Sequence, residues 1–154
     1  GTVSETTHTL TPMNASCNAD AAYEGTVIGG TLATLQCSIG TNWQANTDGK
    51  FLLLEDVDEP AYRIDRMLLH LQQSGRFEGV EAILLGDFTQ NSSETDTEAV
   101  QVILQQFVDY VPIPVYRIEG IGHGKQHLTI PLGTRAILQH TTLICETGRT
   151  HENG

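Results

Sequence analysis

The sequence has few positive charges. It carries 8 Lys and Arg residues against 19 Asp and Glu residues, and its formal net charge at pH 7 is −11. A protein that grips nucleic-acid phosphates without regard to base sequence needs a basic face, which lysine and arginine supply. The composition therefore predicts no nucleic-acid partner.

Cysteine is scarce and long apolar runs are absent. Cys17, Cys37 and Cys145 are widely spaced, odd in number and form no Cys-x-x-Cys pair. This pattern argues against a disulfide framework and against a cysteine-rich zinc site. No run approaches the roughly 18 apolar residues of a membrane span, and no basic-then-apolar stretch indicates a signal peptide. We therefore expect a cytoplasmic protein without membrane contact.

The chain length fits one domain with two polar ends. Its 154 residues are 39% hydrophobic, which is enough for a sizeable core. Residues 1–22 are rich in Thr, Ser and Asn, as in a linker or flexible lead-in, and residues 147–154 form a polar tail that we expect to be flexible. Residues 23–146 are the predicted folded domain.

Helical spacing appears in three places. The clearest apolar repeat, at i, i+3, i+4 and i+7, consists of Ile64, Met67, Leu68 and Leu71. Glycine follows two of the segments, as it does at many helix ends. The sequence predicts helices over residues 31–39, over residues 60–75, and after a capping box formed by Thr95 and Glu98.

Short apolar runs between these segments predict strands. A continuous apolar run bounded by turn residues is typical of a strand buried on both faces. The expected strands cover residues 51–54, 80–85, 113–118, 128–130, 134–138 and 141–145, and residues 26–30 form a turn-prone lead into the first helix. Strands that alternate with helices predict an α/β domain.

Two acidic residues follow the first predicted buried strand. Glu55 and Asp56 stand at its carboxyl end, where open α/β folds gather their functional sites. The alternative is that both acids are solvated turn residues or partners for the dipole of the helix that begins near Pro60. Their position alone favours the second reading.

His123 is a candidate because of its surroundings. It lies in Gly120-Ile-Gly-His-Gly-Lys125, where the glycines allow a sharp turn that brings an imidazole into a cleft. A surface histidine is the simpler alternative. The phosphate-loop spacing is absent, and Gly124 opposes the helix that a zinc pair of His123 and His127 would need. We therefore expect no phosphate or metal site.

Four blocks of the sequence together resemble the LD-carboxypeptidase family, also called murein tetrapeptide carboxypeptidases. The similarity spans about residues 25–138, and its most specific parts are the second block and the last. In order, the blocks are Gly29-Gly-Thr-Leu-Ala-Thr-Leu35, Leu53-Leu-Glu-Asp-Val-Asp-Glu-Pro-Ala-Tyr-Arg-Ile-Asp-Arg-Met67, Leu85-Gly-Asp-Phe88 and Gly122-His-Gly-Lys-Gln-His-Leu-Thr-Ile-Pro-Leu-Gly133.

The resemblance implies a serine peptidase of two domains with a Ser-Glu-His triad and no cofactor. This chain resembles the C-terminal domain, a three-layer, swivelling β/β/α-like unit in which Glu55 and His123 fall on the triad positions. A neutral imidazole can accept and return the serine proton, while a carboxylate fixes the ring tautomer. His123 is then the general base and acid, and Glu55 orients it.

The third triad member is missing from the sequence. No Gly-x-Ser-x-Gly nucleophile motif occurs in the 154 residues, and none of the serines matches a nucleophile block. The family places the nucleophile in an N-terminal domain. We therefore expect the isolated chain to be inactive and to need a serine-bearing N-terminal domain as its partner.

Thr31 marks a departure from the family pattern, which usually has Asn after Gly-Gly. At the start of a helix this residue can still receive the substrate carboxylate, so Thr31 is the predicted substrate-binding residue. The alternative is a plain helix N-cap.

Three functions fit the resemblance. The first is release of the terminal D-alanine from murein tetrapeptides during peptidoglycan recycling in the cytoplasm, by a protein that forms homodimers. The second is cleavage of a peptide-nucleotide antibiotic by the microcin-immunity branch, which needs aromatic cover for a base, whereas Trp43 is the single tryptophan. The third is a catalytically idle binding or dimerisation module. The sequence favours the first.

Overall fold

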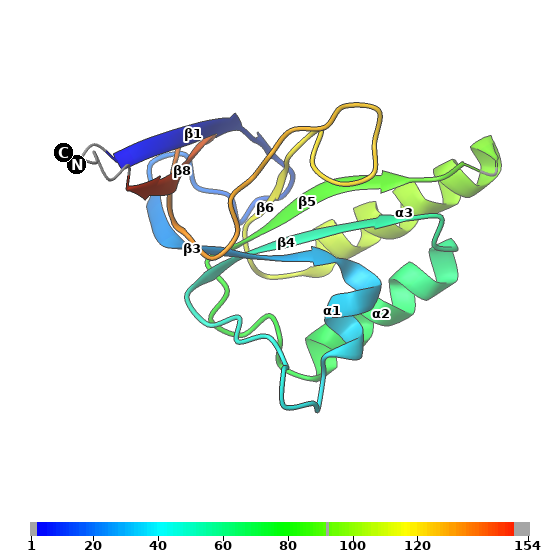
Figure 1. The fold of residues 1–154 in the computed structure, drawn as a ribbon. Helices are drawn as coiled ribbons and strands as arrows, with labels where there is room; N and C mark the ends of the chain where they lie inside the picture. Colours follow the sequence, from blue (N-terminus) through cyan, green and yellow to red (C-terminus); the bar gives the residue numbers. More distant parts are fainter. Residues whose placement is uncertain (1–2, 92, 150–154) are drawn as a thin grey trace.

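The computed structural model describes residues 3–91 and 93–149, which form one curled sheet with three helices (Figure 1). The strand order in the sheet is β1-β8-β7-β3-β4-β5-β6-β2. The strands are β1 (Val3–Thr9), β2 (Thr11–Pro12), β3 (Ala22–Thr31), β4 (Lys50–Val57), β5 (Ala82–Thr89), β6 (Val115–Arg117), β7 (Arg135–Gln139) and β8 (Thr142–Arg149). The helices are α1 (Leu32–Cys37), α2 (Ala61–Gln73) and α3 (Glu94–Tyr110). The α/β expectation is confirmed.

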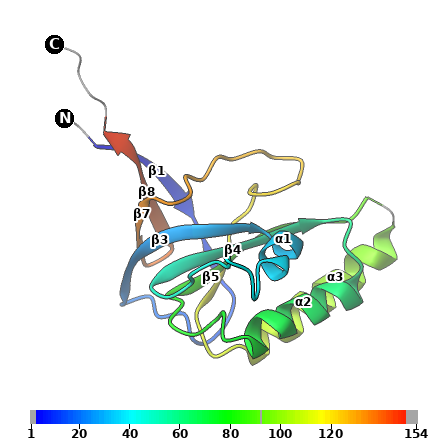
Figure 2. The same cartoon turned by 60° about the horizontal axis from the view of Figure 1, so that its bottom comes forward.

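The central strands β3, β4, β5 and β6 are parallel to one another and carry a core on each face. Because successive side chains of a strand point to opposite faces, the apolar runs supply both cores. Leu52 and Leu54 pack with the three helices, whereas Phe51 and Leu53 pack with residues of β7 and β8. Figure 2 shows the helices on one side of the central strands and the curled strands β1, β7 and β8 at the other end. The three layers expected from the resemblance are present.

Helix α2 forms as its apolar spacing predicts. Its buried residues are Ile64, Met67, Leu68 and Leu71. Helix α3 begins two residues earlier than predicted, because Ser93 is its N-cap and accepts a hydrogen bond from the backbone N–H of Asp96. The capping box predicted at Thr95 and Glu98 is therefore wrong.

The sequence-based description of the N-terminal segment is corrected by the structure. The linker predicted for residues 1–22 instead includes β1, which pairs antiparallel with β8, and β2, which pairs with β6. Threonine favours strands, and an edge strand pairs through its backbone without needing an apolar face. The turn-prone lead predicted for residues 26–30 lies inside β3.

Two further strand predictions differ from the structure. Residues 128–130 form no strand, because the Leu128 N–H donates to the Gly120 carbonyl and closes a loop instead of joining the sheet. Strand β8 extends through residue 149, so residues 147–149 belong to the sheet, and residues 150–154 of the predicted tail lie outside the described residues. Within the described ranges no helix is long and apolar enough to cross a membrane.

Candidate functional site

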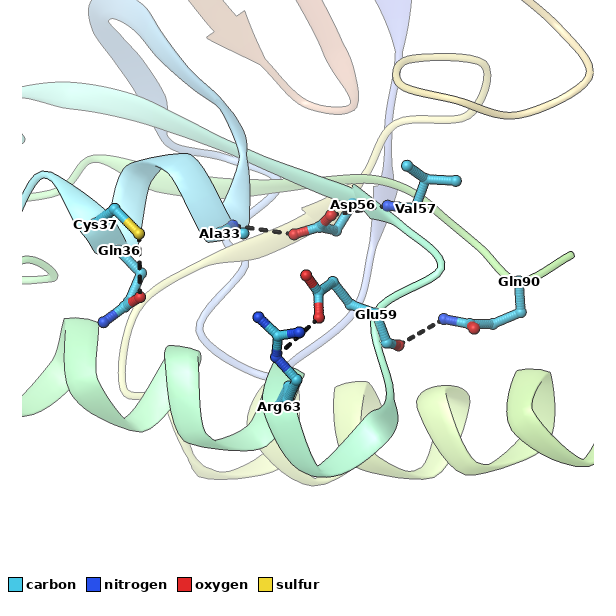
Figure 3. Close-up of polar contacts among 8 residues, drawn as sticks. All are labelled: Ala33, Gln36, Cys37, Asp56, Val57, Glu59, Arg63 and Gln90. Atoms are coloured by element: carbon cyan, nitrogen blue, oxygen red, sulfur yellow. Dashed lines mark hydrogen bonds and ion pairs between the residues drawn. The ribbon is translucent and has the colours of Figure 1, made fainter. Parts of the chain in front are cut away.

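Two residues near the carboxyl end of β4 carry buried carboxylates that lie on opposite faces of the sheet. Glu55 is 5% exposed and Asp56 is 3% exposed. Asp56 Oδ2 accepts a hydrogen bond from the backbone N–H of Ala33 at 3.0 Å, and so ties the first turn of α1 to β4 (Figure 3). Adjacent strand residues point to opposite faces, so Glu55 is directed away from α1. The reading of both acids as solvated turn residues is wrong.

The Glu55 side chain contacts His123 at the carboxyl end of the parallel strands. Glu55 Oε2 lies 2.8 Å from His123 Nδ1, on a loop that follows β6. The carboxylate side chain is 7% exposed, whereas the imidazole side chain is 52% exposed. A carboxylate accepts only, so Nδ1 carries the proton in this contact and Nε2 is the acceptor nitrogen of the neutral ring. Among the described residues Nε2 has no hydrogen-bond partner.

Thr31 completes the set of contacts around Glu55. The Thr31 hydroxyl donates to Glu55 Oε1 at 2.8 Å, which leaves both carboxylate oxygens engaged. Thr31 is the N-cap of α1 by its backbone, but its side chain makes no capping hydrogen bond. The plain N-cap alternative is therefore wrong for the side chain. The hydroxyl donates its proton to Glu55 and keeps its acceptor lone pairs, and the substrate-binding role of Thr31 stays a prediction.

Gly122 allows the His123 loop to rest on Glu55. Its φ is +124°, a conformation that residues with side chains rarely adopt. A Cβ at this position would lie 2.9 Å from Glu55 Oε2. Close approach of the loop backbone to the buried carboxylate therefore requires glycine here, and this approach is what places the adjacent imidazole against Glu55.

The turn between β4 and α2 is fixed by Glu59. Glu59 Oε2 lies 3.2 Å from Arg63 Nε, and the Glu59 carbonyl accepts a hydrogen bond from Gln90 Nε2 at 2.7 Å (Figure 3). These contacts join the ends of β4 and β5 just beyond the site. They stabilise the edge of the sheet from which Glu55 projects.

Two pockets flank the Glu55–His123 pair. One of about 270 Å³ adjoins Thr31 between β3 and α1, and the exposed Trp43 forms part of its wall. The other, of about 360 Å³, lies beside the His123 loop and is lined by charged side chains that include Asp87 and Lys125. Both are open to solvent, and each includes a neighbour of the pair, Thr31 in the first and Gly124 in the second.

No metal centre is formed by the part of the chain that the structure describes. Within residues 3–91 and 93–149 no three His, Cys, Asp or Glu side chains gather in a way that could hold an ion. At Glu55 the carboxylate holds one nitrogen of an exposed imidazole and leaves the other nitrogen open, a geometry that is compatible with proton transfer.

Sequence reasoning missed how Asp56 and Thr31 are used. The sequence pattern groups Asp56 with Glu55, although the alternation of side chains in a strand places them on opposite faces. The Thr31–Glu55 bond follows from the register of β3 and β4, which pairs these two residues directly. The alternation that separates Asp56 from Glu55 can be read in the sequence, whereas the Thr31–Glu55 bond requires the strand register.

A buried carboxylate that holds one nitrogen of an exposed histidine on an α/β sheet is an arrangement that can supply two members of a catalytic triad. The family follows from comparison with known proteins. Residues 24–138 match the family model for the LD-carboxypeptidase C-terminal domain, and the chain belongs to this family.

Curated relatives agree with this assignment. A carboxypeptidase of Rickettsia conorii is 41% identical over 116 residues, which are 75% of this chain and 35% of the relative. The murein tetrapeptide carboxypeptidase of Pseudomonas aeruginosa is 35% identical over 121 residues, which are 78% of this chain and 39% of the relative. The chain thus spans little more than a third of the length of these relatives.

Solved structures share the fold. The muramoyltetrapeptide carboxypeptidase of Oxalobacter formigenes is 29% identical, with a TM-score of 0.69 over 96% of this chain and 50% of that structure. An MccF-like protein of Bacillus anthracis is 25% identical, with a TM-score of 0.67 over 88% of this chain and 42% of that structure. Both branches considered from the sequence are therefore among the relatives.

Proposed function

We propose that this chain is the C-terminal domain of a serine LD-carboxypeptidase that releases the terminal D-alanine from murein tetrapeptides. The observation that carries the proposal is the 2.8 Å contact between a buried carboxylate, Glu55, and an exposed imidazole, His123. The name of the Pseudomonas aeruginosa relative supports the choice of substrate. In this role His123 is the general base and acid, and Glu55 orients it.

The chemistry follows from the protonation of the ring. With Nδ1–H donated to Glu55, the Nε2 lone pair accepts the proton of a serine hydroxyl as the serine oxygen attacks the amide carbonyl. The same Nε2–H then protonates the leaving D-alanine nitrogen. Glu55 stabilises the imidazolium between these steps, and the Thr31 hydroxyl keeps the carboxylate in place.

The serine is assigned to a second, N-terminal domain. Among the described serines, the Ser38 and Ser74 hydroxyls donate to carbonyls of their own helices, and Ser93 caps α3. None of them hydrogen-bonds to His123. The proposal therefore includes a serine-bearing domain that packs against the His123 loop. It also takes the enzyme to be cytoplasmic and homodimeric.

The microcin-immunity type of activity is the second candidate. Trp43 is 57% exposed and lines the pocket next to Thr31, where its indole could stack on a nucleobase. The murein activity is favoured because a single exposed ring provides aromatic cover on one side only. An idle binding module is disfavoured, since it has no need for a buried carboxylate whose two oxygens both serve the orientation of His123.

Substrate choice is tested with the full-length enzyme. Purified enzyme is incubated separately with a murein tetrapeptide and with a peptide-nucleotide, and the released D-alanine or nucleotide product is measured by chromatography. We expect D-alanine release from the tetrapeptide and little cleavage of the nucleotide conjugate. The 154-residue chain alone is the matched control and should release nothing. Preferential cleavage of the conjugate would contradict the murein assignment.

A further inference from the structure

The His123 loop has a second anchor besides Glu55, which is Asp87 of β5. The backbone N–H of Asp87 donates to the Ile121 carbonyl at 2.8 Å, and Asp87 Oδ1 accepts from the Gly120 N–H at 3.3 Å. One residue thus holds two consecutive residues of the loop, immediately before Gly122 and His123. The proposed catalytic chemistry uses neither of these bonds.

A β-bulge explains why Asp87 reaches the loop. Leu54 pairs with Leu85, and Asp56 pairs with Phe88, so the single residue Glu55 of β4 faces two residues of β5, Gly86 and Asp87. Such a bulge leaves the extra residue outside the regular ladder and re-aims its side chain. Asp87 consequently projects toward the loop from the position directly beside Glu55.

The backbone of the loop packs closely against two carboxylates, those of Glu55 and Asp87. A Cβ at Gly122 would crowd Glu55 Oε2, and a Cβ at Gly124 would collide with Asp87 Oδ2. His123 lies between these two glycines, so its backbone is bracketed by Glu55 on one side and Asp87 on the other. Because the imidazole is half exposed and meets the protein through Nδ1, little else determines where the ring sits.

We infer that Asp87 is a positioning residue, which holds the loop so that His123 Nδ1 meets Glu55 Oε2. The inference deepens the proposed function, and its catalytic consequence rests on that function. The positioning of the His123 ring by Asp87 does not rest on it. Without the Asp87 carboxylate, the Gly120 N–H loses its acceptor, and this part of the loop keeps only the bond from the Asp87 N–H to the Ile121 carbonyl as its link to Asp87. The ring then loses its fixed contact with Glu55 and, with it, the preference for a proton on Nδ1.

The tautomer of the His123 ring shows directly whether Asp87 positions it against Glu55. Two-bond ¹H–¹⁵N correlations of the ¹⁵N-histidine-labelled chain, at a pH of about 8.5, well above the ordinary histidine pKa of about 6.5, show which ring nitrogen carries the proton. His123→Ala assigns the signal among the six histidines. We expect an Nδ1–H ring in the unsubstituted chain and a shift toward Nε2–H in Asp87→Ala.

Two variants separate positioning from folding. Asp87→Asn keeps an oxygen that can accept from the Gly120 N–H and should retain the Nδ1–H form. Gly124→Ala keeps the Asp87 carboxylate but places a Cβ against it, so that either the carboxylate or the loop must move and the bond to the Gly120 N–H is disturbed. This variant should lose the Nδ1–H form as Asp87→Ala does, and it tests the inference if Asp87→Ala fails to fold. Asp58→Gly is the matched control, because Asp58 holds a different loop through Asn91 and its φ of 53° suits glycine.

Turnover measurements distinguish the positioning role of Asp87 from the proposed catalytic role of His123. In the full-length enzyme, Asp87→Ala should lower kcat for D-alanine release by about ten- to a hundredfold and leave KM within about twofold, since a misplaced base costs the chemical step rather than binding. An unchanged His123 tautomer in Asp87→Ala and Gly124→Ala would overturn the positioning role. A changed tautomer with undiminished D-alanine release would leave that role standing and refute the catalytic assignment of His123.

Discussion

Replacing Thr31 by valine should destabilise the domain by an amount that the structure allows us to work out. The substitution keeps the shape of the side chain and removes only the hydroxyl that donates to Glu55 Oε1 at 2.8 Å. The Glu55 carboxylate is almost fully buried, so water cannot replace the lost donor. A hydrogen bond to a charged group contributes about 1.5–3 kcal/mol, and a buried acceptor left without its donor costs a similar amount.

The assay is urea or thermal unfolding of the 154-residue chain. For a domain of this size each kcal/mol changes Tm by about 2–4 °C, so Thr31→Val should lower Tm by about 3–12 °C. Thr31→Ser retains the hydroxyl and should recover most of the loss. Thr34→Val, at an exposed residue of α1, measures the cost of exchanging a threonine for valine where no contact with Glu55 is lost. A loss in Thr31→Val no more than about 0.5 kcal/mol above that of Thr34→Val would refute the reasoning.

Three further outcomes are expected from the core, the buried histidine and the cysteines. Leu84→Ala, in the fully buried centre of β5, should lower the free energy of unfolding by about 2–5 kcal/mol, whereas Leu69→Ala on the exposed face of α2 should cost far less in the same denaturant titration. Burial lowers the pKa of His8 below 6.5, so protons bind the unfolded chain more readily and stability should fall as the pH drops through about 6.5; urea midpoints at several pH values should show this, and His8→Gln should weaken the dependence. Burial raises the pKa of Cys145 to about 11, so a thiol reagent at pH 8 should label the exposed Cys37 long before Cys145, as peptide mass mapping would show.

The parts of the fold that sequence predicts are those with strong apolar patterns. The repeat from Ile64 to Leu71 and the continuous run at residues 51–54 permit few alternatives, because each must be buried to form at all. Strand β1 escaped prediction because it is an edge strand with mostly exposed side chains, held by backbone pairing with β8. A polar, threonine-rich segment looks the same in a linker and in such a strand.

The candidate site was predicted through family resemblance more than through local pattern. Position alone favoured solvated roles for Glu55 and for His123, and only the matching blocks raised them to triad members. The Thr31 bond and the Asp87 anchor depend on strand register and on a bulge between β4 and β5. Both are properties of strand pairing, which a single sequence does not display.

Turnover of triad variants tests the central claim most directly. D-Alanine release from murein tetrapeptide is measured for the full-length enzyme carrying His123→Ala or Glu55→Gln, with unfolding curves to verify that each variant is folded. We expect losses on the order of a thousandfold or more in kcat for both, because one removes the proton carrier and the other leaves the ring poorly oriented. Near wild-type release by either folded variant would contradict the assignment of His123 as the general base and acid of the triad and of Glu55 as the carboxylate that orients it.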